Sequence, residues 1–275
     1  MLIHHSRYLT RGEVWFDEEP TGRAVDWILY RQRPQPAPRS RWRYFYTRLL
    51  DLRGSPEALL ASMSHSTAYK IRRARDRDRV MGERLDPCAD GVLDQFEVMY
   101  RRFAASRALG PLDRPMLNTM AAGGVLDLSV AREPSGPVLV YHLYYRGRQR
   151  SSLLFSTSLY QDLGDSAARN ALGRANCLLF WTDFLRFKEQ GLTHFDFGGW
   201  YTGHTDAARL SINRFKEGFG GAVVREYNCE RILSWKAWAV LTMAQALRRA
   251  RAAAHWLELQ WPRLGLLKPQ GTSAA

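Results

Sequence analysis

Residues 193–221 have the sequence THFDFGGWYTGHTDAARLSINRFKEGFGG, and this stretch decides the fold expected for the chain. A short strand, Thr193–Phe197, carries Asp196 into a turn at Gly198-Gly199, and a second glycine cluster follows at residues 218–221. Glycine lets a ligand approach the backbone closely and adopts positive φ angles. Two such clusters around one acid and one lysine, Lys216, therefore predict a site. The alternative is a set of turn glycines beside a solvated ion pair.

Composition describes a folded, strongly basic protein. The 275 residues are 45% hydrophobic and include nine tryptophans, which excludes a disordered chain. A formal net charge of +13 favours anionic partners, but it does not choose among nucleic acid, anionic lipid and phosphate-bearing cofactors. The sequence shows no signal peptide, no apolar run of membrane-spanning length and no zinc-ligand spacing. We therefore expect a cytoplasmic protein without a metal site.

The first half of the chain is expected to contain three helices and one clear strand. Residues 31–43 are rich in proline and arginine and are expected to form a linker or a long loop. Tyr44–Leu52 is the expected strand, and Ser55-Pro56 has the pattern of a helix start. Helices are also predicted at Asp90–Ala105 and Arg114–Ala122, where apolar residues recur every three or four positions.

The second half predicts a meander followed by a crossover. Strand-like runs lie at residues 125–131, 138–145 and 151–158, and turn residues separate them. A helix over Arg174–Gln190, ended by Gly191, and the strand Thr193–Phe197 then complete a unit whose two strands should be parallel.

Ala222–Tyr227 is the last expected strand, and Ser234–Leu259 is a terminal helix. The fold class is therefore α/β, with a mixed sheet flanked by helices. We expect three parts, at residues 1–124, 125–233 and 234–275. Tryptophans and arginines along the terminal helix suit peripheral contact with the inner face of a membrane, although a helix packed on the domain would look similar.

The start of the crossover helix is a candidate phosphate site. Residues 170–176, NALGRAN, place Gly173, Arg174 and Asn176 at the expected junction between loop and helix. Free amides and the positive dipole end at a helix N-terminus favour a phosphate, and an arginine adds a charge-assisted contact. Alternatively, Gly173 only ends the loop and Arg174 is solvated.

The order of these motifs resembles the GNAT acyltransferase superfamily, and within it the Fem-like branch. GRAN, a helix ending in FKEQG, THFDFGG and INRFKEGFGG follow one another as in that branch. Asn170-x-x-Gly173-x-Ala175 resembles the superfamily's phosphate-binding loop, with asparagine where glutamine or arginine is usual. Tyr69–Ala74 resembles the cationic helix motif of Fem-like proteins. The resemblance implies two related GNAT-like halves and a donor site made by Asn170, Gly173, Arg174, Ala175 and Asn176.

The resemblance also implies acyl or aminoacyl transfer onto an amine. Lys216 would then stabilise developing negative charge, and Asp196 would either deprotonate or orient the amine or act as a structural acid that accepts hydrogen bonds from the following glycine amides. His194 is a further candidate base, and His204 is a reserve. The residues expected to contact substrate are Gly198, Gly199, Asn213, Phe215, Arg72 and Arg73.

These features predict an N-acyltransferase that uses acyl-coenzyme A or an acyl carrier protein as donor. The acceptor would be an amine of a sugar, a lipid-linked saccharide or a small metabolite, as in the synthesis of cell-envelope polysaccharides. One alternative is a Fem-like transferase that uses aminoacyl-tRNA. In that case Arg72 and Arg73 would bind the phosphate backbone of the tRNA. Another is a non-catalytic scaffold that binds an anionic polymer or a membrane, and the arginines of that helix also suit a plain solvated face.

Overall fold

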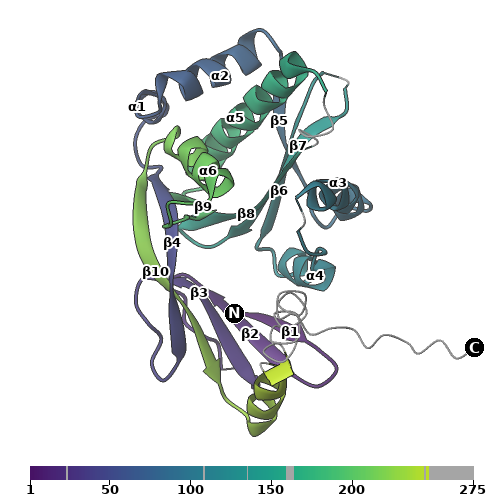
Figure 1. Ribbon diagram of the computed structural model, residues 1–275, viewed down its shortest axis with the longest axis vertical. Helices are drawn as coiled ribbons and strands as arrows, with labels where there is room; N and C mark the ends of the chain where they lie inside the picture. Colours follow the sequence, from purple (N-terminus) through teal and green to yellow (C-terminus); the bar gives the residue numbers. More distant parts are fainter. Residues whose placement is uncertain (23, 108, 135, 159–163, 245, 248–275) are drawn as a thin grey trace, which may run out of the picture.

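The computed structural model describes residues 1–247 except 23, 108, 135, 159–163 and 245, and these described residues form one mixed sheet with helices on both faces (Figure 1). Its strands are β1 Leu2–His5, β2 Thr10–Trp15, β3 Trp27–Arg33, β4 Arg41–Asp51, β5 Met81–Leu85, β6 Leu126–Arg132, β7 Val138–Arg146, β8 Arg150–Ser158, β9 His194–Gly199 and β10 Ala222–Ile232. They lie in the order β1-β2-β3-β10-β4-β9-β8-β7-β6-β5. The pairs β2–β3 and β8–β9 are parallel, and the other neighbours are antiparallel.

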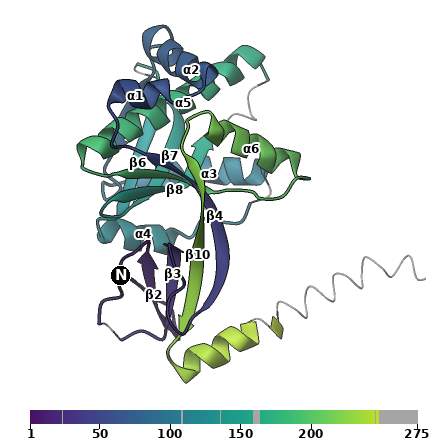
Figure 2. The ribbon, with the colours of Figure 1, turned by 90° about the vertical axis from the view of Figure 1, so that its left-hand side faces the viewer.

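The helices are α1 Pro56–Ala61, α2 His65–Asp76, α3 Val92–Ser106, α4 Arg114–Ala122, α5 Ser166–Glu189 and α6 Ala207–Glu217. Figure 1 shows α1, α2, α5 and α6 on one face of the central strands and α3 with α4 on the other. Each group of helices closes its own hydrophobic core against the sheet. The strands β4 and β10 continue beyond the helices, where β10 pairs with β3 (Figure 2).

Most elements of the second half agree with the prediction from the sequence. The antiparallel meander is β6, β7 and β8, and the helix α5 connects β8 to the parallel strand β9. The helix start predicted at Ser55-Pro56 and the helix predicted over residues 114–122 are also confirmed. The α/β class with a mixed sheet flanked by helices is therefore confirmed.

The predicted start of the crossover helix was wrong by two turns. Helix α5 begins at Ser166, and the Asp165 side chain caps it by accepting hydrogen bonds from the amides of Ala167 and Ala168 at 3.1 and 3.0 Å. Gly173 was expected at the junction between loop and helix, but it lies inside the helix. A glycine there weakens a helix by only about 1 kcal/mol relative to alanine, and the packing of α5 offsets this.

Several other elements were not predicted, or were predicted with different bounds. The connection between β3 and β4 spans residues 34–40, so the expected loop over 31–43 is shorter, because both strands take residues from it to pair with β10. The strands β1–β3 and the helix α6 were not predicted.

The division into two related halves stays a prediction. The expected boundary at residue 124 falls between α4 and β6, and β5 on one side of it pairs with β6 on the other.

Residues 235–244 are helical, as expected for the start of the terminal helix, whereas residues 248–259 of that prediction lie outside the described residues. Among the described helices, none combines the length and the apolar character that crossing a membrane requires.

Candidate active site

The strands β8 and β9 part after three pairs of residues. Their parallel pairing joins residues 150–152 to residues 194–196 and then stops. At Gly198 the backbone turns with φ +71°, and a Cβ there would lie 3.0 Å from the carbonyl oxygen of Leu153. A side chain at this position would be strained by the positive φ and crowded against Leu153, so glycine is favoured where the two strands separate.

The Gly198 peptide is held from both sides. Its N–H donates to Asp196 Oδ1 at 2.7 Å, and its carbonyl accepts from Thr47 Oγ1 at 2.9 Å and from Lys216 Nζ at 3.2 Å. Lys216 also donates to the Gly199 carbonyl at 2.6 Å. The structure thus brings together Asp196, Lys216 and both glycines at the end of β9.

Lys216 is a nearly buried cation, with 8% of its surface exposed. Burial lowers the pKa of its ammonium group to about 8, and the neighbouring charge of Asp196 opposes part of this shift. The side chain is therefore still mostly protonated at pH 7, close to the pH at which it loses its proton.

Asp196 is fully buried, and its carboxylate is engaged by the protein. Besides the Gly198 amide, Thr47 Oγ1 donates to it, and Arg150 forms an ion pair with Oδ2. Arg150 also binds Glu226 at 2.5 and 2.8 Å, and its guanidinium lies 4.5 Å from the ring centre of Phe16. These contacts match the structural alternative for Asp196. Arg150, Thr47 and Glu226 were not singled out from the sequence.

Of the cavities formed by described residues, one lies at the start of β9 and two lie at its end. The polar cavity, about 700 Å³, is lined by Arg150, His194, Glu226 and the segment 16–19. The parting cavity, about 250 Å³, opens at Gly198 and Gly199 and is lined by Trp15, Phe45, Met120 and Leu153. The outer cavity, about 460 Å³, is lined by Gly199, Trp200, Tyr201, Arg209 and Asn213.

The remaining predicted contact residues on β9 and α6 lie in different surroundings. His194 lines the polar cavity, with Nδ1 2.9 Å from Thr193 Oγ1. Asn213 lines the outer cavity and holds the backbone of Tyr201 through two hydrogen bonds of 2.7 and 3.2 Å. Phe215 packs between Phe180 and Phe219 in the core, because its side of α6 faces the sheet. His204 is exposed.

The residues predicted to bind the acyl donor lie along α5 and not at its N-terminus, where the first backbone amides have no partner within the helix. Asn170 is exposed, Ala175 is buried in the core and Gly173 is inside the helix. Arg174 donates through Nε to Asp78 at 2.5 Å. The first-turn amides of Ala167 and Ala168 are occupied by the Asp165 cap.

Arg174 nevertheless shares a surface with the cationic helix α2. The Arg73 guanidinium donates to the Tyr69 hydroxyl at 3.0 Å, and this hydrogen bond, together with the charges of Arg73, Arg77 and Arg174, lowers the pKa of Tyr69. Arg72 is exposed on the same helix. The α2–α5 surface therefore gathers Arg73 and Arg174, two of the predicted phosphate-binding and substrate-binding residues.

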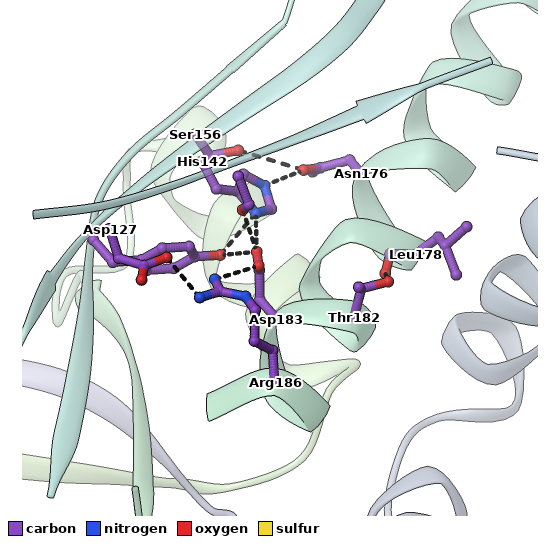
Figure 3. A network of polar contacts seen from close by, with 10 residues as sticks. Asp127, His142, Ser156, Asn176, Leu178, Thr182, Asp183 and Arg186 are labelled. Atoms are coloured by element: carbon purple, nitrogen blue, oxygen red, sulfur yellow. Dashed lines mark hydrogen bonds and ion pairs between the residues drawn. The ribbon is translucent and has the colours of Figure 1, made fainter. Parts of the chain in front are cut away.

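Asn176 points into a polar network beneath α5 (Figure 3). Its Oδ1 lies 2.8 Å from His142 Nε2 and 3.4 Å from Ser156 Oγ. At the centre of the network, Asp183 Oδ2 accepts from Tyr144 at 2.6 Å and from Ser129 at 2.8 Å, and Oδ1 accepts from Arg186 at 2.9 Å. Asn176 is thus tied to the core of the sheet.

The sequence contained a signal for this network that was not used. Asp183 interrupts the otherwise apolar, buried face of the helix, and Arg186 lies three residues later. Complete burial would raise the pKa of the Asp183 carboxyl, but hydrogen bonds with His142 and Tyr144 and the charge of Arg186 hold it below its ordinary value. Asp183 is therefore charged and satisfied inside the protein.

Comparison with known proteins identifies the fold. Neither a family model nor a curated protein matches the sequence. A crystal structure of FemX superposes with a TM-score of 0.56 at 15% identity over 71% of this chain and 63% of the FemX chain. The chain thus spans less than two thirds of the length of that protein.

Two further structures share less of their geometry with this chain. The C-terminal domain of a putative lysylphosphatidylglycerol synthetase from Agrobacterium fabrum has a TM-score of 0.46 at 13% identity, over 78% of this chain and 71% of that one. Saccharomyces cerevisiae N-myristoyltransferase with bound myristoyl-CoA has a TM-score of 0.39 at 14% identity, over 76% and 52%. The sheet order, the crossover through α5, the parting of β8 from β9 and the FemX superposition together show that this chain has the GNAT-like fold of Fem-type proteins.

Proposed function

We propose that the protein is an N-acyltransferase that moves an acyl group from a thioester, acyl-coenzyme A or acyl carrier protein, to an amine. The amine nitrogen attacks the thioester carbonyl carbon, the carbon–sulfur bond breaks, and an amide and a free thiol form, the thiol taking up the proton that the amine loses. The acceptor amine belongs to a sugar, a lipid-linked saccharide or a small metabolite of the cell envelope.

One observation carries this proposal: β8 and β9 part at a fixed glycine turn, and a cavity opens there. A thioester carbonyl placed where β8 and β9 separate would lie beside the Gly198–Gly199 turn, to which Lys216 and Asp196 are hydrogen-bonded. Such preorganised polar groups stabilise developing charge without rearranging during the reaction. Asp196 and Lys216 position the turn, and the Lys216 charge acts through it. His194, the base expected from the sequence, lines the polar cavity at the start of β9, four residues before Gly198, so it would take the amine's proton only through intervening water.

The donor's phosphates would be attracted by the α2–α5 surface. Arg73 lies there, Arg174 lies farther along α5 and pairs with Asp78, and Arg72 is exposed next to them. Arginine side chains are frequent partners of phosphate groups.

The test is transfer by the full-length protein from acyl-coenzyme A to an amino sugar, with the amide detected by mass spectrometry. We expect Lys216→Met to lower kcat more than tenfold while coenzyme A still raises the Tm. Lys188→Met is the matched control, because Lys188 Nζ also donates to two backbone carbonyls, those of Leu52 and Arg53, at 3.1 and 3.2 Å. Equal activity of both variants, or no effect of coenzyme A on the Tm of the native protein, contradicts the proposal.

A second candidate function, transfer from aminoacyl-tRNA, is favoured by an uncovered face of the sheet. The side chains of Trp42 and Tyr44 are half exposed, their ring centres lie 5.2 Å apart, and the Arg225 guanidinium lies 5.0 Å from the Tyr44 ring. Farther along β4, Arg48 lies 5.3 Å from the ring of Trp200, which lines the outer cavity. Aromatic rings interleaved with arginines are the usual platform for single-stranded nucleic acid.

RNase-sensitive copurification of tRNA distinguishes this candidate from the first. We expect Tyr44→Ala to release the RNA and Tyr8→Ala, an exposed tyrosine between β1 and β2, to retain it if the donor is tRNA. Stabilisation by coenzyme A without bound RNA favours the thioester donor instead. If neither donor binds, the non-catalytic scaffold becomes the better interpretation.

We also propose that the protein acts in the cytoplasm at the inner face of an anionic membrane, through the helix that begins at residue 235. Trp235 and Trp238 are 78% and 58% exposed, and Met243 is also exposed, whereas Ala237 is buried. Figure 2 shows the first turns of this helix (yellow-green) at the end of β10, projecting from the sheet. A cationic protein that presents an amphipathic helix suits an anionic lipid surface.

A further inference from the structure

A row of aromatic side chains runs along the uncovered face of β4 and β10. We call it the aromatic track, and its members are Trp42, Tyr44 and Tyr46 from β4, Tyr227 from β10, and Trp200 and Tyr201 directly after β9. The ring centres of Trp42 and Tyr44 lie 5.2 Å apart, and Tyr227 lies 5.3 and 5.5 Å from them. Figure 2 shows β4 and β10 continuing past α6 with no described helix in front of them. Trp42 and Tyr44 are each 49% exposed, and contiguous exposed rings of this kind mark binding surfaces.

The aromatic track leads to the proposed site of transfer. The backbone N–H of Trp200 donates to the Tyr46 carbonyl at 2.7 Å, which joins the end of β9 to the middle of β4. Trp200 and Gly199 line the outer cavity, and Gly199 also lines the parting cavity. From Trp42 to Arg48, β4 is roughly 20 Å long at the rise of an antiparallel strand, which is several times the length of one sugar ring. A chain molecule that lies on the track would therefore end at the turn.

The track offers many rings and few available cations. Arg48 already donates to two backbone carbonyls at 2.6 and 3.0 Å, and Arg209 forms an ion pair with Asp206 at 3.2 Å. Arg225 is exposed and lies 5.0 Å from the centre of one ring of the track. A nucleic acid carries a charge on every nucleotide and binds largely through cations that neutralise these phosphates. The excess of rings over available guanidinium groups therefore favours a chain of uncharged or sparsely charged rings.

Sugar rings have the chemistry that fits this surface. A pyranose presents C–H groups on its face and hydroxyls along its edge. The negative face of an aromatic ring attracts the positively polarised hydrogens of such C–H groups. Tyrosine hydroxyls and guanidinium groups are hydrogen-bonding partners for the sugar hydroxyls. Because four of the six rings of the track are tyrosines, the track can meet both the face and the edge of a sugar.

We propose that the acceptor is an amino sugar at the end of an uncharged or sparsely charged oligosaccharide, whose other sugar rings stack on the aromatic track and place the amine at Gly199. This inference rests on the proposed acyl transfer, because it takes the separation of β8 and β9 as the site of reaction. It deepens that function by choosing one class of acceptor: a chain of several sugars rather than a single amino sugar or another small metabolite.

The first test measures binding of uncharged and charged sugar chains to the full-length protein. Calorimetry compares the dimer and the hexamer of three chains: chitin oligosaccharides, cello-oligosaccharides and hyaluronan, in which every second sugar carries a carboxylate. We expect at least one hexamer to bind about tenfold more tightly than its dimer, because each further ring contact should tighten binding about two- to tenfold. None of these chains needs a donor, so the result does not depend on coenzyme A.

The second test measures transfer from acyl-coenzyme A to chitin oligosaccharides that carry one free amine on their terminal sugar. KM should fall as the chain is lengthened from dimer to hexamer, while kcat stays the same. Contacts far from the reacting amine are equally strong in the ground state and in the transition state, and such uniform binding changes KM alone.

A matched pair of tyrosine variants locates the binding. Tyr44→Ala should raise the KM of the hexamer amine about fivefold or more and leave kcat and the KM of the dimer amine unchanged. Tyr8→Ala is the control, because Tyr8 is 68% exposed and lies between β1 and β2, away from the track. It should change none of these values.

The outcomes keep this inference apart from the proposed function. Equal affinities of dimer and hexamer for all three chains, a KM that is independent of chain length, or equal effects of the two variants would overturn the inference even if coenzyme A raises the Tm and transfer to glucosamine occurs. Length-dependent binding that Tyr44→Ala removes, without any effect of coenzyme A, would support the saccharide site and contradict the thioester donor.

Two other occupants of the track would also overturn the inference. A uridine oligonucleotide that displaces the hexamers, binds more tightly and loses affinity steeply with salt would assign the track to nucleic acid. A dimer of the native protein that Tyr44→Ala dissociates, seen by light scattering, would assign the track to a second copy of the chain.

Discussion

At the scale of single residues, Lys216 is the group whose chemistry depends most on its surroundings. Its ammonium donates to two carbonyls of the Gly198–Gly199 turn, and burial lowers its pKa to about 8. In the unfolded chain the same group titrates near 10.5. Between these two values the unfolded state binds the extra proton, so the folded state gains stability as the pH rises through this window.

We therefore expect the free energy of unfolding of the native protein to rise between pH 8 and pH 10.5 relative to that of Lys216→Met. The relative gain should amount to a few kcal/mol, because one pKa unit corresponds to about 1.4 kcal/mol. Urea unfolding of both proteins at pH 7 and pH 10 measures it. Parallel pH profiles for the two proteins would show that Lys216 titrates as a solvated lysine.

At the scale of elements, α5 joins the predicted donor surface to the core. Its outer side carries Arg174 next to α2, and its inner side carries Asp183 into the network with Tyr144 and Arg186. The helix therefore cannot shift without breaking buried ionic contacts, and this fixes the position of β9 that follows it.

Asp183→Ala should lower the free energy of unfolding by about 3–5 kcal/mol, because it leaves three buried donors without their acceptor and leaves Arg186 with only Asp127 as its ionic partner. Asp165→Ala on the same helix is the matched control, and the loss of this exposed cap should cost only about 1 kcal/mol. Urea denaturation of both variants gives the comparison. Similar losses would mean that the network is no more important to stability than a helix cap.

The terminal helix gives a prediction of its own. Replacing both Trp235 and Trp238 by alanine should lower binding to phosphatidylglycerol vesicles at least tenfold, because these exposed rings would otherwise insert among the lipids. Co-sedimentation with phosphatidylglycerol and with phosphatidylcholine vesicles measures the binding and its dependence on charge. Alanine at Trp42 and Tyr44, which are exposed on the sheet, is the control and should change nothing. Binding unaffected by the helix substitutions would place the membrane contact elsewhere.

At the scale of the whole molecule, local patterns predicted the second half well and the first half poorly. The strands of the meander show alternation or β-rich runs bounded by turn residues, so β6, β7 and β8 were found from the sequence alone. The strands β1–β3 are short and mixed in composition, and β3 joins the rest of the sheet by pairing with β10, about two hundred residues away. No local pattern reports a pairing of that separation.

The candidate site was predicted in the same uneven way. Asp196, Lys216, Gly198 and Gly199 were found because they lie within one short stretch, and the structure brings them into contact. Arg150, Thr47 and Glu226 were missed because each comes from a different strand of the sheet. The donor residues on α5 were displaced because Gly173 was interpreted as a helix end, although tertiary packing outweighs its low helix propensity.

The sequence by itself determined the α/β class, the crossover from β8 to β9 and the glycine turn after Asp196, because periodicity and backbone freedom are local properties. Only the tertiary structure decided which side chains meet that turn. Arg150 closes on Asp196, and the parting cavity opens between β8, β9 and α4. Burial, ion pairing and cavity shape depend on groups far apart in the chain, and they exist only once the sheet has assembled.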